Sequence, residues 1–228
     1  MDIIVALDCD YEKAKRIVEI LSDRVRIFKI GSVLFVKNYR IIEFVISRNC
    51  SVFLDLKLFD IPNTVRNTVK NLIDMNIYSL SVHIAGGPSM LRAAKESAED
   101  KIKIWGVSIL TSIDAHEYSR IGFRYSLEHQ VLHFARIAEE VGIDGVISSP
   151  RELYYLKRFI KKLKFITPSI RLEKDVFYDD QRRFMTPCEA VKAGADYIVV
   201  GRPVIDSPDP RKAIETIIED INGCKKNT

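Results

Sequence analysis

Short apolar runs alternate with longer amphipathic segments along the whole chain. Between the short runs, hydrophobic residues recur at helical spacing, as in Tyr11–Leu21, Thr64–Met75, Leu91–Ala98, Leu127–Val141 and Pro187–Ala193. The short runs are rich in β-branched residues, which favours strands. These predicted strands are Ile3–Leu7, Arg26–Ile30, Val52–Lys57, Ser79–His83, Ile104–Ile109, Gly145–Ile147, Phe165–Thr167 and Tyr197–Val200.

The alternation of strand and helix predicts parallel pairing through right-handed crossovers. Eight such repeats in 228 residues fit a closed barrel better than an open sheet. A dinucleotide-binding open sheet would show GxGxxG after its first strand, whereas here Asp8-Cys9-Asp10 follows. No linker-like stretch divides the chain. We therefore predict an α/β protein, a single (β/α)8 TIM barrel that forms one domain over residues 1–228.

Composition narrows the class of protein. Hydrophobic residues make up 47% and charged residues 29% of the chain, as in ordinary globular proteins. The net charge of +4 comes without a basic cluster, so we expect no nucleic-acid partner. No signal-like leader and no apolar stretch of ~18 residues occurs, so we expect a cytoplasmic protein without a membrane partner. The cysteines lack CxxC spacing, so no cysteine metal site is expected. A disulfide framework is not expected in a chain of this length.

Polar residues gather where the predicted strands end. Active sites of such barrels lie at the carboxyl ends of the strands. A charge within an apolar strand is costly unless it is paired, so we expect these groups to pair with one another and with a ligand. The residues at these ends are Asp8, Lys29, Asp55, Lys57, His83, Thr111, Ser112, Pro168, Arg171, Gly201 and Arg202.

The third strand supplies the central charged pair. Strand side chains alternate with period two, so Asp55 and Lys57 face the barrel mouth while the intervening leucine faces the helices. Lys29 on the neighbouring strand can reach the same point. Asp60 lies on the following loop, because Ile61-Pro62 requires an extended turn, and it can reach its own site or that of a neighbouring subunit. At ~4 Å and an effective dielectric of ~20, each opposite pair gains about 4 kcal/mol before desolvation.

This pattern distinguishes between two lysine chemistries. A Schiff-base lysine must be neutral, through burial or a nearby cation. Carboxylates before and after Lys57 favour the charged ammonium instead, so we predict that Lys57 donates a proton. Asp55 would repel a substrate carboxylate, and loss of CO₂ would relieve that repulsion. A lone Asp-x-Lys on a strand is most often a surface ion pair, but the longer run around it is far more specific. We interpret His83 as a hydrogen-bonded residue at the end of a strand rather than a catalyst.

The run Asp55-Leu56-Lys57-Leu58-Phe59-Asp60-Ile61-Pro62-Asn63-Thr64 resembles the signature of orotidine 5′-phosphate decarboxylases. The resemblance covers essentially the whole chain, although Ser169 stands where the family usually has glycine. If the backbone there has a positive φ, serine would be strained. The other matching segments, in family order, are Ala6–Asp8, Phe28–Gly31, Val82–Gly87, Leu110–Ser112, Thr167–Arg171, Asp179–Arg183 and Val200–Pro203.

The resemblance implies decarboxylation of orotidine 5′-phosphate to UMP in de novo pyrimidine biosynthesis, without a metal or another cofactor. It implies that Lys57 is the proton donor, that Asp55 opposes the substrate carboxylate, and that Lys29 pairs with Asp55. Asp60, with Ile61 and Thr64, would reach the site of the partner subunit in a homodimer.

The remaining implied roles concern the ribose, the base and the phosphate. Barrels often bind phosphate after strands seven and eight, and the segment 173–184 would close over the ligand. Asp8 and Lys29 would bind ribose hydroxyls, Thr111 would contact the pyrimidine in the same site as Pro168, and Gln181, Gly201 and Arg202, with Arg171 nearby, would hold the 5′-phosphate.

Two alternatives stay open. A related metal-dependent barrel, such as a keto-acid phosphate decarboxylase, hexulose-phosphate synthase or epimerase, also places Asp and Lys on the third strand. The continuation Asp60–Thr64 and the loop Leu110–Ser112 argue against it. A barrel that binds nucleotides without catalysis is the other alternative, and the intact Lys-Asp-Lys-Asp set argues against that.

Overall fold

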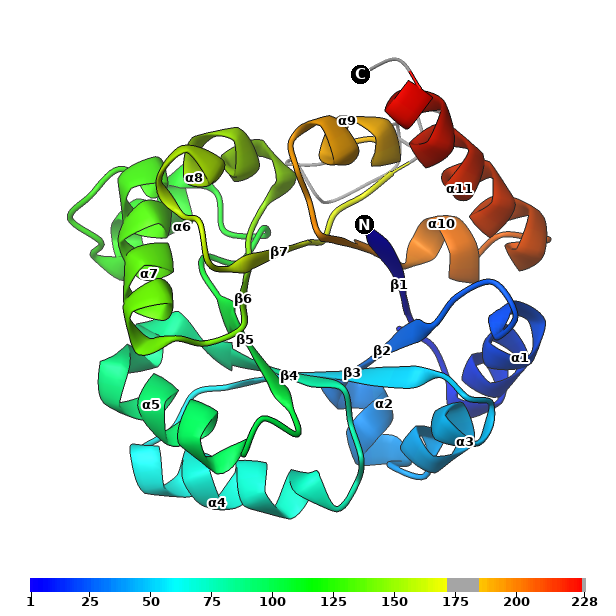
Figure 1. Ribbon diagram of the computed structural model, residues 1–228, viewed down its shortest axis with the longest axis horizontal. Helices are drawn as coiled ribbons and strands as arrows, with labels where there is room; N and C mark the ends of the chain where they lie inside the picture. Colours follow the sequence, from blue (N-terminus) through cyan, green and yellow to red (C-terminus); the bar gives the residue numbers. More distant parts are fainter. Residues whose placement is uncertain (172–184, 227–228) are drawn as a thin grey trace.

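The computed structural model describes residues 1–171 and 185–226, and within them eight parallel strands close into a barrel (Figure 1). The strands are β1 (Asp2–Ala6), β2 (Ile27–Gly31), β3 (Ser51–Leu58), β4 (Ser79–His83), β5 (Lys103–Val107), β6 (Gly145–Ile147), β7 (Lys164–Thr167) and β8 (Tyr197–Val200). Each strand pairs with its neighbours in sequence, and β1 closes the barrel on β8. The predicted (β/α)8 barrel is confirmed, with each strand within two residues of its predicted bounds.

Helices surround the barrel (Figure 1). The predicted helices Tyr11–Leu21 and Leu127–Val141 have the predicted bounds, whereas the helix predicted from Thr64 begins earlier, at Pro62, because proline suits the first turn. The helices are α1 (Tyr11–Leu21), α2 (Ser32–Lys37), α3 (Ile41–Ser47), α4 (Pro62–Ile73), α5 (Gly87–Ser97), α6 (Ala115–Ile121), α7 (Leu127–Val141), α8 (Leu153–Phe159), α9 (Pro187–Lys192), α10 (Arg202–Ile205) and α11 (Pro210–Lys226), with 3-10 turns η1 (Ile84–Gly86) and η2 (Pro150–Glu152).

Side-chain capping sets where the longer helices begin. The Asp10 carboxylate accepts a hydrogen bond from the Lys13 backbone N–H at 2.9 Å, which caps α1. The Ser126 hydroxyl caps α7 in the same way, and α7 ends at Gly142, whose φ of 80° suits a residue without a Cβ. The buried faces of both helices pack against the strands.

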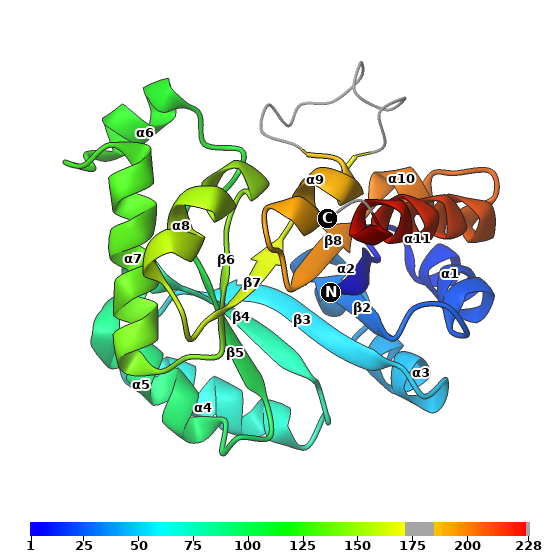
Figure 2. The ribbon, with the colours of Figure 1, turned by 45° about the horizontal axis from the view of Figure 1, so that its top comes forward.

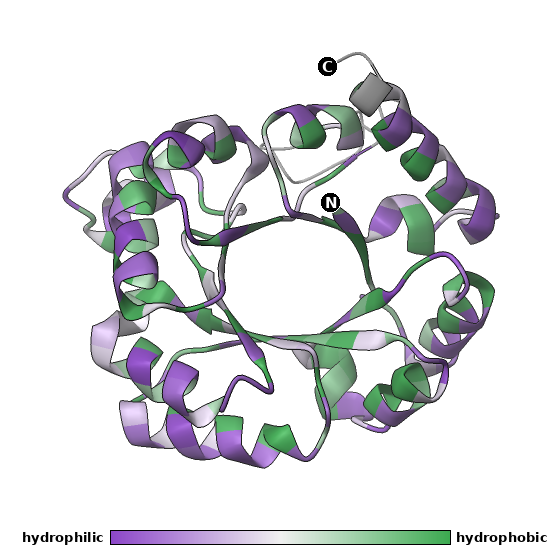
Figure 3. Cartoon of the chain, viewed as in Figure 1, coloured by the Kyte–Doolittle hydropathy of each residue, from purple (hydrophilic) through white to green (hydrophobic). Residues whose placement is uncertain are grey.

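The barrel has an outer and an inner apolar layer. Figure 3 shows largely hydrophobic strands inside helices that carry both polar and apolar residues. Within the barrel, the Phe53 and Trp105 rings lie 4.6 Å apart, and the Tyr78 and Tyr197 hydroxyls lie 2.8 Å apart. Tyr197 begins β8 and Tyr78 immediately precedes β4, so the tyrosine side of this cluster closes the amino end of the barrel, whereas Ala6, Phe53 and Val199 lie nearer the carboxyl end. A ligand therefore has access from the carboxyl end. The inner cluster comprises Ile4, Ala6, Ile27, Phe53, Trp105, Ile166, Tyr197 and Val199.

The pairing of β3 with β4 is irregular next to the mouth. Leu54 pairs with Leu80, but Leu58 pairs with Val82, so three residues of β3 lie opposite one residue of β4. This bulge contains Lys57, whose φ is 50°. Bulges bend a strand and re-aim its side chains, and this one lies where the charged pair leaves the strand.

The last helices group beside β8 (Figure 2). Cys188 at the start of α9 forms a disulfide with Cys224 near the end of α11, with their Cα atoms 5.5 Å apart. The sequence argued only against a disulfide framework, and this single pair was not predicted. The two residues are 36 positions apart in sequence, and only the packing of α11 against α9 brings them together. In the described ranges, no helix combines the length and apolar character needed to span a membrane.

Candidate active site

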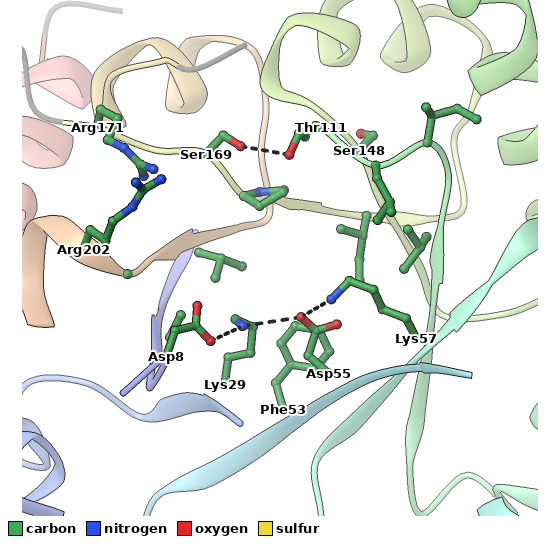
Figure 4. A pocket seen from close by; sticks show the side chains of 18 residues that line it. Asp8, Lys29, Phe53, Asp55, Lys57, Thr111, Ser148, Ser169, Arg171 and Arg202 are labelled. Carbon is green, nitrogen blue, oxygen red and sulfur yellow. Dashed lines mark hydrogen bonds and ion pairs between the residues drawn. The ribbon is translucent and has the colours of Figure 1, made fainter. Parts of the chain in front are cut away.

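A cavity of about 420 Å³ opens at the carboxyl ends of the strands (Figure 4). Its lining combines charged groups at two ends with an apolar wall between them. The charged lining residues are Asp8, Lys29, Asp55, Lys57, Arg171 and Arg202. The apolar lining residues include Val107, Ile109, Leu110, Ile147 and Val199. The lining also includes Thr111, Ser148, Pro168, Ser169 and Gly201. Nearly all the residues expected at the mouth of the barrel therefore meet in one cavity.

Charges of alternating sign run across one side of the cavity. The Lys57 Nζ lies 2.8 Å from Asp55 Oδ2, and the Lys29 Nζ lies 3.5 Å from the same oxygen. Lys29 also contacts Asp8 Oδ1 at 2.9 Å. Gly31 leaves room for this pair, because an added Cβ would lie 3.3 Å from Asp8 Oδ1 and 3.7 Å from Lys29 Nζ. The structure thus brings together four of the predicted charged residues.

The surroundings of Asp55 and Lys29 keep both side chains charged. Burial raises the pKa of the Asp55 carboxyl, but the charges of Lys29 and Lys57, with hydrogen bonds from Lys57 and Ser81, outweigh burial and lower it. Burial lowers the pKa of the Lys29 ammonium, but Asp55 and Asp8 outweigh it and raise that pKa. Near neutral pH Asp55 is therefore a carboxylate and Lys29 an ammonium.

His83 lies at the edge of this array. Burial and then the charge of Lys57 lower the pKa of its imidazole. Its ring lies 5.8 Å from that of Phe59, and the imidazole is neutral near neutral pH. That it takes no part in catalysis stays a prediction.

Lys57 has a strained backbone. Its φ of 50° is uncommon for a residue with a side chain, and its N–H donates to the Ser81 hydroxyl at 2.8 Å. Conformations of this kind occur mostly where the surroundings hold them in place for function. Other described residues, such as Asn49 and Glu99, also have a positive φ, so this conformation is informative at Lys57 because it coincides with the charged pair in the cavity.

Two guanidinium groups form the opposite end of the cavity. Figure 4 shows the Arg171 and Arg202 side chains pointing toward each other, away from Lys57. Ser169 on the same loop has a φ of 64°, so the condition under which serine is strained at this position is met. Its hydroxyl donates to Thr111 Oγ1 at 3.4 Å. An anion between the two arginines would accept charge-assisted hydrogen bonds from both.

Some predicted site residues lie elsewhere. The structure describes Asp60, Ile61 and Thr64. The described lining of the cavity does not include them. The Asp60 carboxylate accepts a hydrogen bond from the Ile61 N–H at 2.7 Å, and the Ile61 side chain is 65% exposed. Within one subunit the alternating array therefore comprises Asp8, Lys29, Asp55 and Lys57, and the exposed Asp60 stays a predicted contributor to the site of a partner subunit. Gln181 and the whole of the segment 173–184 lie outside the described residues.

Sequence reasoning missed two polar residues of the site. Ser148 follows β6 and lines the cavity, and its position after a strand could have identified it. Ser81 on β4 contacts both Asp55 and Lys57. Its signal was the alternation Ser79-Leu80-Ser81-Val82-His83, which places polar residues on one side of an apolar strand.

Metal-binding side chains do not cluster in this part of the protein. Within residues 1–171 and 185–226, no three residues among His, Cys, Asp and Glu are placed to hold a metal ion. The mouth carboxylates Asp8 and Asp55 face lysines instead. The expectation of a cofactor-free site stays a prediction.

The barrel with a charged mouth and two facing arginines defines a class, that of (β/α)8-barrel enzymes acting on small anionic substrates. A model of the orotidine 5′-phosphate decarboxylase / HUMPS family matches residues 1–217. The chain therefore belongs to this family.

Individual relatives support the same family assignment. The chain is 43% identical to an orotidine 5′-phosphate decarboxylase of Dictyoglomus turgidum, over 96% of each protein. It is 40% identical to one of Carboxydothermus hydrogenoformans, over 97% of this chain and 96% of the relative. The crystal structure of orotidine 5′-phosphate decarboxylase from Lactobacillus acidophilus superimposes with a TM-score of 0.84 at 33% identity, covering 97% of this chain and 99% of that one.

Proposed function

We propose that this protein decarboxylates orotidine 5′-phosphate to UMP in pyrimidine biosynthesis, as a carboxy-lyase. The observation that supports this most directly is the Asp55 carboxylate between two ammonium groups at one end of the cavity, with two arginines at the other. A substrate with a carboxylate at one end and a phosphate at the other matches this charge distribution.

The reaction requires a negative charge beside the departing carboxylate and an acid beside the carbon left behind. Asp55 repels the substrate carboxylate in the ground state, and this repulsion is lost as CO₂ forms. The C6–carboxylate bond breaks and its electron pair stays on C6. The Lys57 ammonium stabilises this carbanion and transfers a proton to C6. The lysine then regains a proton from solvent.

The rest of the cavity holds the remainder of the nucleotide. Arg202 and Gly201, with Arg171, bind the 5′-phosphate, since a guanidinium offers several donors to one anion. Lys29 and Asp8 bind ribose hydroxyls. The wall next to Thr111 and Pro168 accepts the pyrimidine.

The family also includes HUMPS enzymes, so the substrate needs an argument of its own. The relatives at 40% and 43% identity bear the decarboxylase name. The chain also has the Asp60–Thr64 continuation. Loss of activity on adding EDTA would favour a metal-dependent relative instead.

Absorbance of orotidine 5′-phosphate mixed with purified protein tests the proposal. Conversion to UMP changes the absorbance spectrum of the pyrimidine. If micromolar enzyme produces no such change, the proposed decarboxylase activity is wrong. Lys57→Ala should abolish turnover while UMP still binds, because it removes the acid and leaves the phosphate end intact. An unaltered kcat in this variant would refute the proposed role of Lys57.

We further propose a homodimer with shared sites. Large apolar side chains are exposed beside the mouth: Val33 and Val36 on α2 are 82% and 84% exposed, and Phe59 beside Asp60 is 66% exposed. The strands that precede these segments, β2 and β3, are neighbours. Burying such a surface against a second copy would bring Asp60 toward the partner's site, where Ile61 and Thr64 would follow it.

Subunit mixing tests the shared site. Inactive Lys57→Ala and Asp60→Ala proteins, mixed under conditions that exchange subunits, should regain activity, because one of the two sites in a mixed dimer is then fully wild type. No recovery despite demonstrated exchange would count against sharing. A cytoplasmic location, and the lack of nucleic-acid and membrane partners, stay predictions.

A further inference from the structure

Ser81 lies opposite the bulge that contains Lys57. Three residues of β3 face this one residue of β4, and Ser81 is fully buried. A bulge interrupts the hydrogen-bond ladder between strands, and a buried backbone N–H without a partner is costly. Something must therefore take the place of the missing ladder carbonyl at Lys57.

The Ser81 hydroxyl does so, and contacts Asp55 at the same time. Its oxygen accepts from the Lys57 backbone N–H at 2.8 Å, and its proton goes to Asp55 Oδ1 at 2.7 Å. A serine hydroxyl can donate once and accept as well, so the two bonds are compatible. With Oδ1 held in this way, Asp55 Oδ2 is the oxygen that faces both lysines.

We propose that Ser81 is a positioning residue for the decarboxylation: its hydroxyl fixes the rotation of the Asp55 carboxylate and the bulged backbone of Lys57. This inference rests on the proposed function. Ser81 acts through these two residues, since the described cavity lining does not include it. Without the hydroxyl, the carboxylate is free to turn and the Lys57 N–H loses its partner, so the acid and the opposing charge lose their alignment.

The matched pair Ser81→Thr and Ser81→Val tests this, because the two side chains have nearly the same shape and differ in the hydroxyl. Ser79→Ala is the control: Ser79 lies on the same side of β4, is also fully buried, and its hydroxyl has no hydrogen-bond partner among the described residues. We expect Ser81→Val to lower kcat about 10- to 100-fold, as misplacement of a reacting group does. Affinity for UMP should change little. Ser81→Thr and Ser79→Ala should keep most of the activity.

The pH profile separates positioning from general loosening of the core. The Asp55 carboxylate is faced by Lys29 on β2, Lys57 on β3 and Ser81 on β4, with Asp8 on β1 and His83 at the end of β4 nearby. Removing the Ser81 donor raises the pKa of Asp55. The acid limb of the kcat/KM profile should therefore move to higher pH in Ser81→Val, but not in Ser81→Thr or Ser79→Ala.

The outcomes are distinguishable. Wild-type protein inactive on orotidine 5′-phosphate would overturn the proposed function itself. Active wild type with unchanged kcat and acid limb in Ser81→Val, or an equal loss in Ser81→Thr, would overturn the role of Ser81. Should Ser81→Val fail to fold, as judged by circular dichroism, Ser81→Ala adds no atom and is read by the same criteria.

Discussion

Replacing Asp55 by asparagine removes the charge that holds two lysines together. Asp55 is 7% exposed, and its Oδ2 lies 2.8 Å from Lys57 Nζ and 3.5 Å from Lys29 Nζ. At an effective dielectric of ~20, these contacts are worth about 6 and about 5 kcal/mol before desolvation. Desolvation cancels much of this. Removing one partner of a buried pair nevertheless costs about 3–5 kcal/mol, and this applies to Lys29, whose side chain is 12% exposed, more than to Lys57, whose side chain is 37% exposed. We expect Asp55→Asn to lower the free energy of unfolding by that amount.

Urea unfolding measures this loss, and the chain offers a matched control. Lys13 and Asp206 also pair at 2.9 Å, but their side chains are 40% and 56% exposed, so Asp206→Asn should cost less than about 1 kcal/mol. Equal m-values for the proteins would show that the midpoints report stability alone. If Asp55→Asn unfolds at the same urea concentration as Asp206→Asn, the stabilising role assigned to the buried pairs is wrong.

The pH dependence of this difference has a definite sign. The pKa of Asp55 is lowered in the folded protein, so its contribution to stability is present above the ordinary aspartate value of about 3.9. It is lost as the pH falls through the lowered folded-state pKa. The stability gap between wild type and Asp55→Asn should therefore stay constant from neutral pH to about pH 5 and shrink in stronger acid.

Three further variants probe other parts of the molecule. Arg202→Ala should raise KM for orotidine 5′-phosphate about 10- to 100-fold, the equivalent of about 1.5–3 kcal/mol of charge-assisted hydrogen bonding. Binding of uridine, which lacks the phosphate, should not change. Equal losses for the two ligands would argue against a phosphate-binding role for Arg202. Cys188→Ser should lower the free energy of unfolding by about 2–4 kcal/mol, since the disulfide with Cys224 closes a long loop, and only the wild type should lose thermal stability on adding dithiothreitol. Ser169→Gly should change the free energy of unfolding by less than about 1 kcal/mol, because glycine relieves the strain of a left-handed backbone but loses the weak hydrogen bond to Thr111. A large drop in melting temperature would show that this hydrogen bond contributes more than its length suggests.

Much of the fold was predictable because it follows from local periodicity. The bounds of Leu127–Val141 were predicted because apolar residues recur at helical spacing up to Gly142, where a positive φ ends the helix. The contact between α9 and α11 could not be predicted in the same way. It depends on packing between segments far apart in sequence, so the pairing of Cys188 with Cys224 was missed.

The site was predictable in its charges but not in its backbone. Period-two alternation and barrel closure were sufficient to bring Asp55, Lys57 and Lys29 together. They could not show that Lys57 adopts a φ of 50°, because a register shift depends on how β4 pairs with β3. The contacts of Ser81 with Asp55 and Lys57 also depend on how β4 pairs with β3, so the sequence of β4 alone could not predict them.

The bulge between β3 and β4 limits how this chemistry could be transplanted. A designer who copied Asp55-Leu56-Lys57 onto an ordinary strand would space the two Cα positions about 6.6 Å apart along it, with no mismatch across the ladder and no hydroxyl behind the carboxylate. The portable unit is therefore a two-strand one: three residues of one strand and the single serine opposite them. Natural or engineered barrels that kept the charged pair but restored regular pairing would hold the same groups in a different alignment.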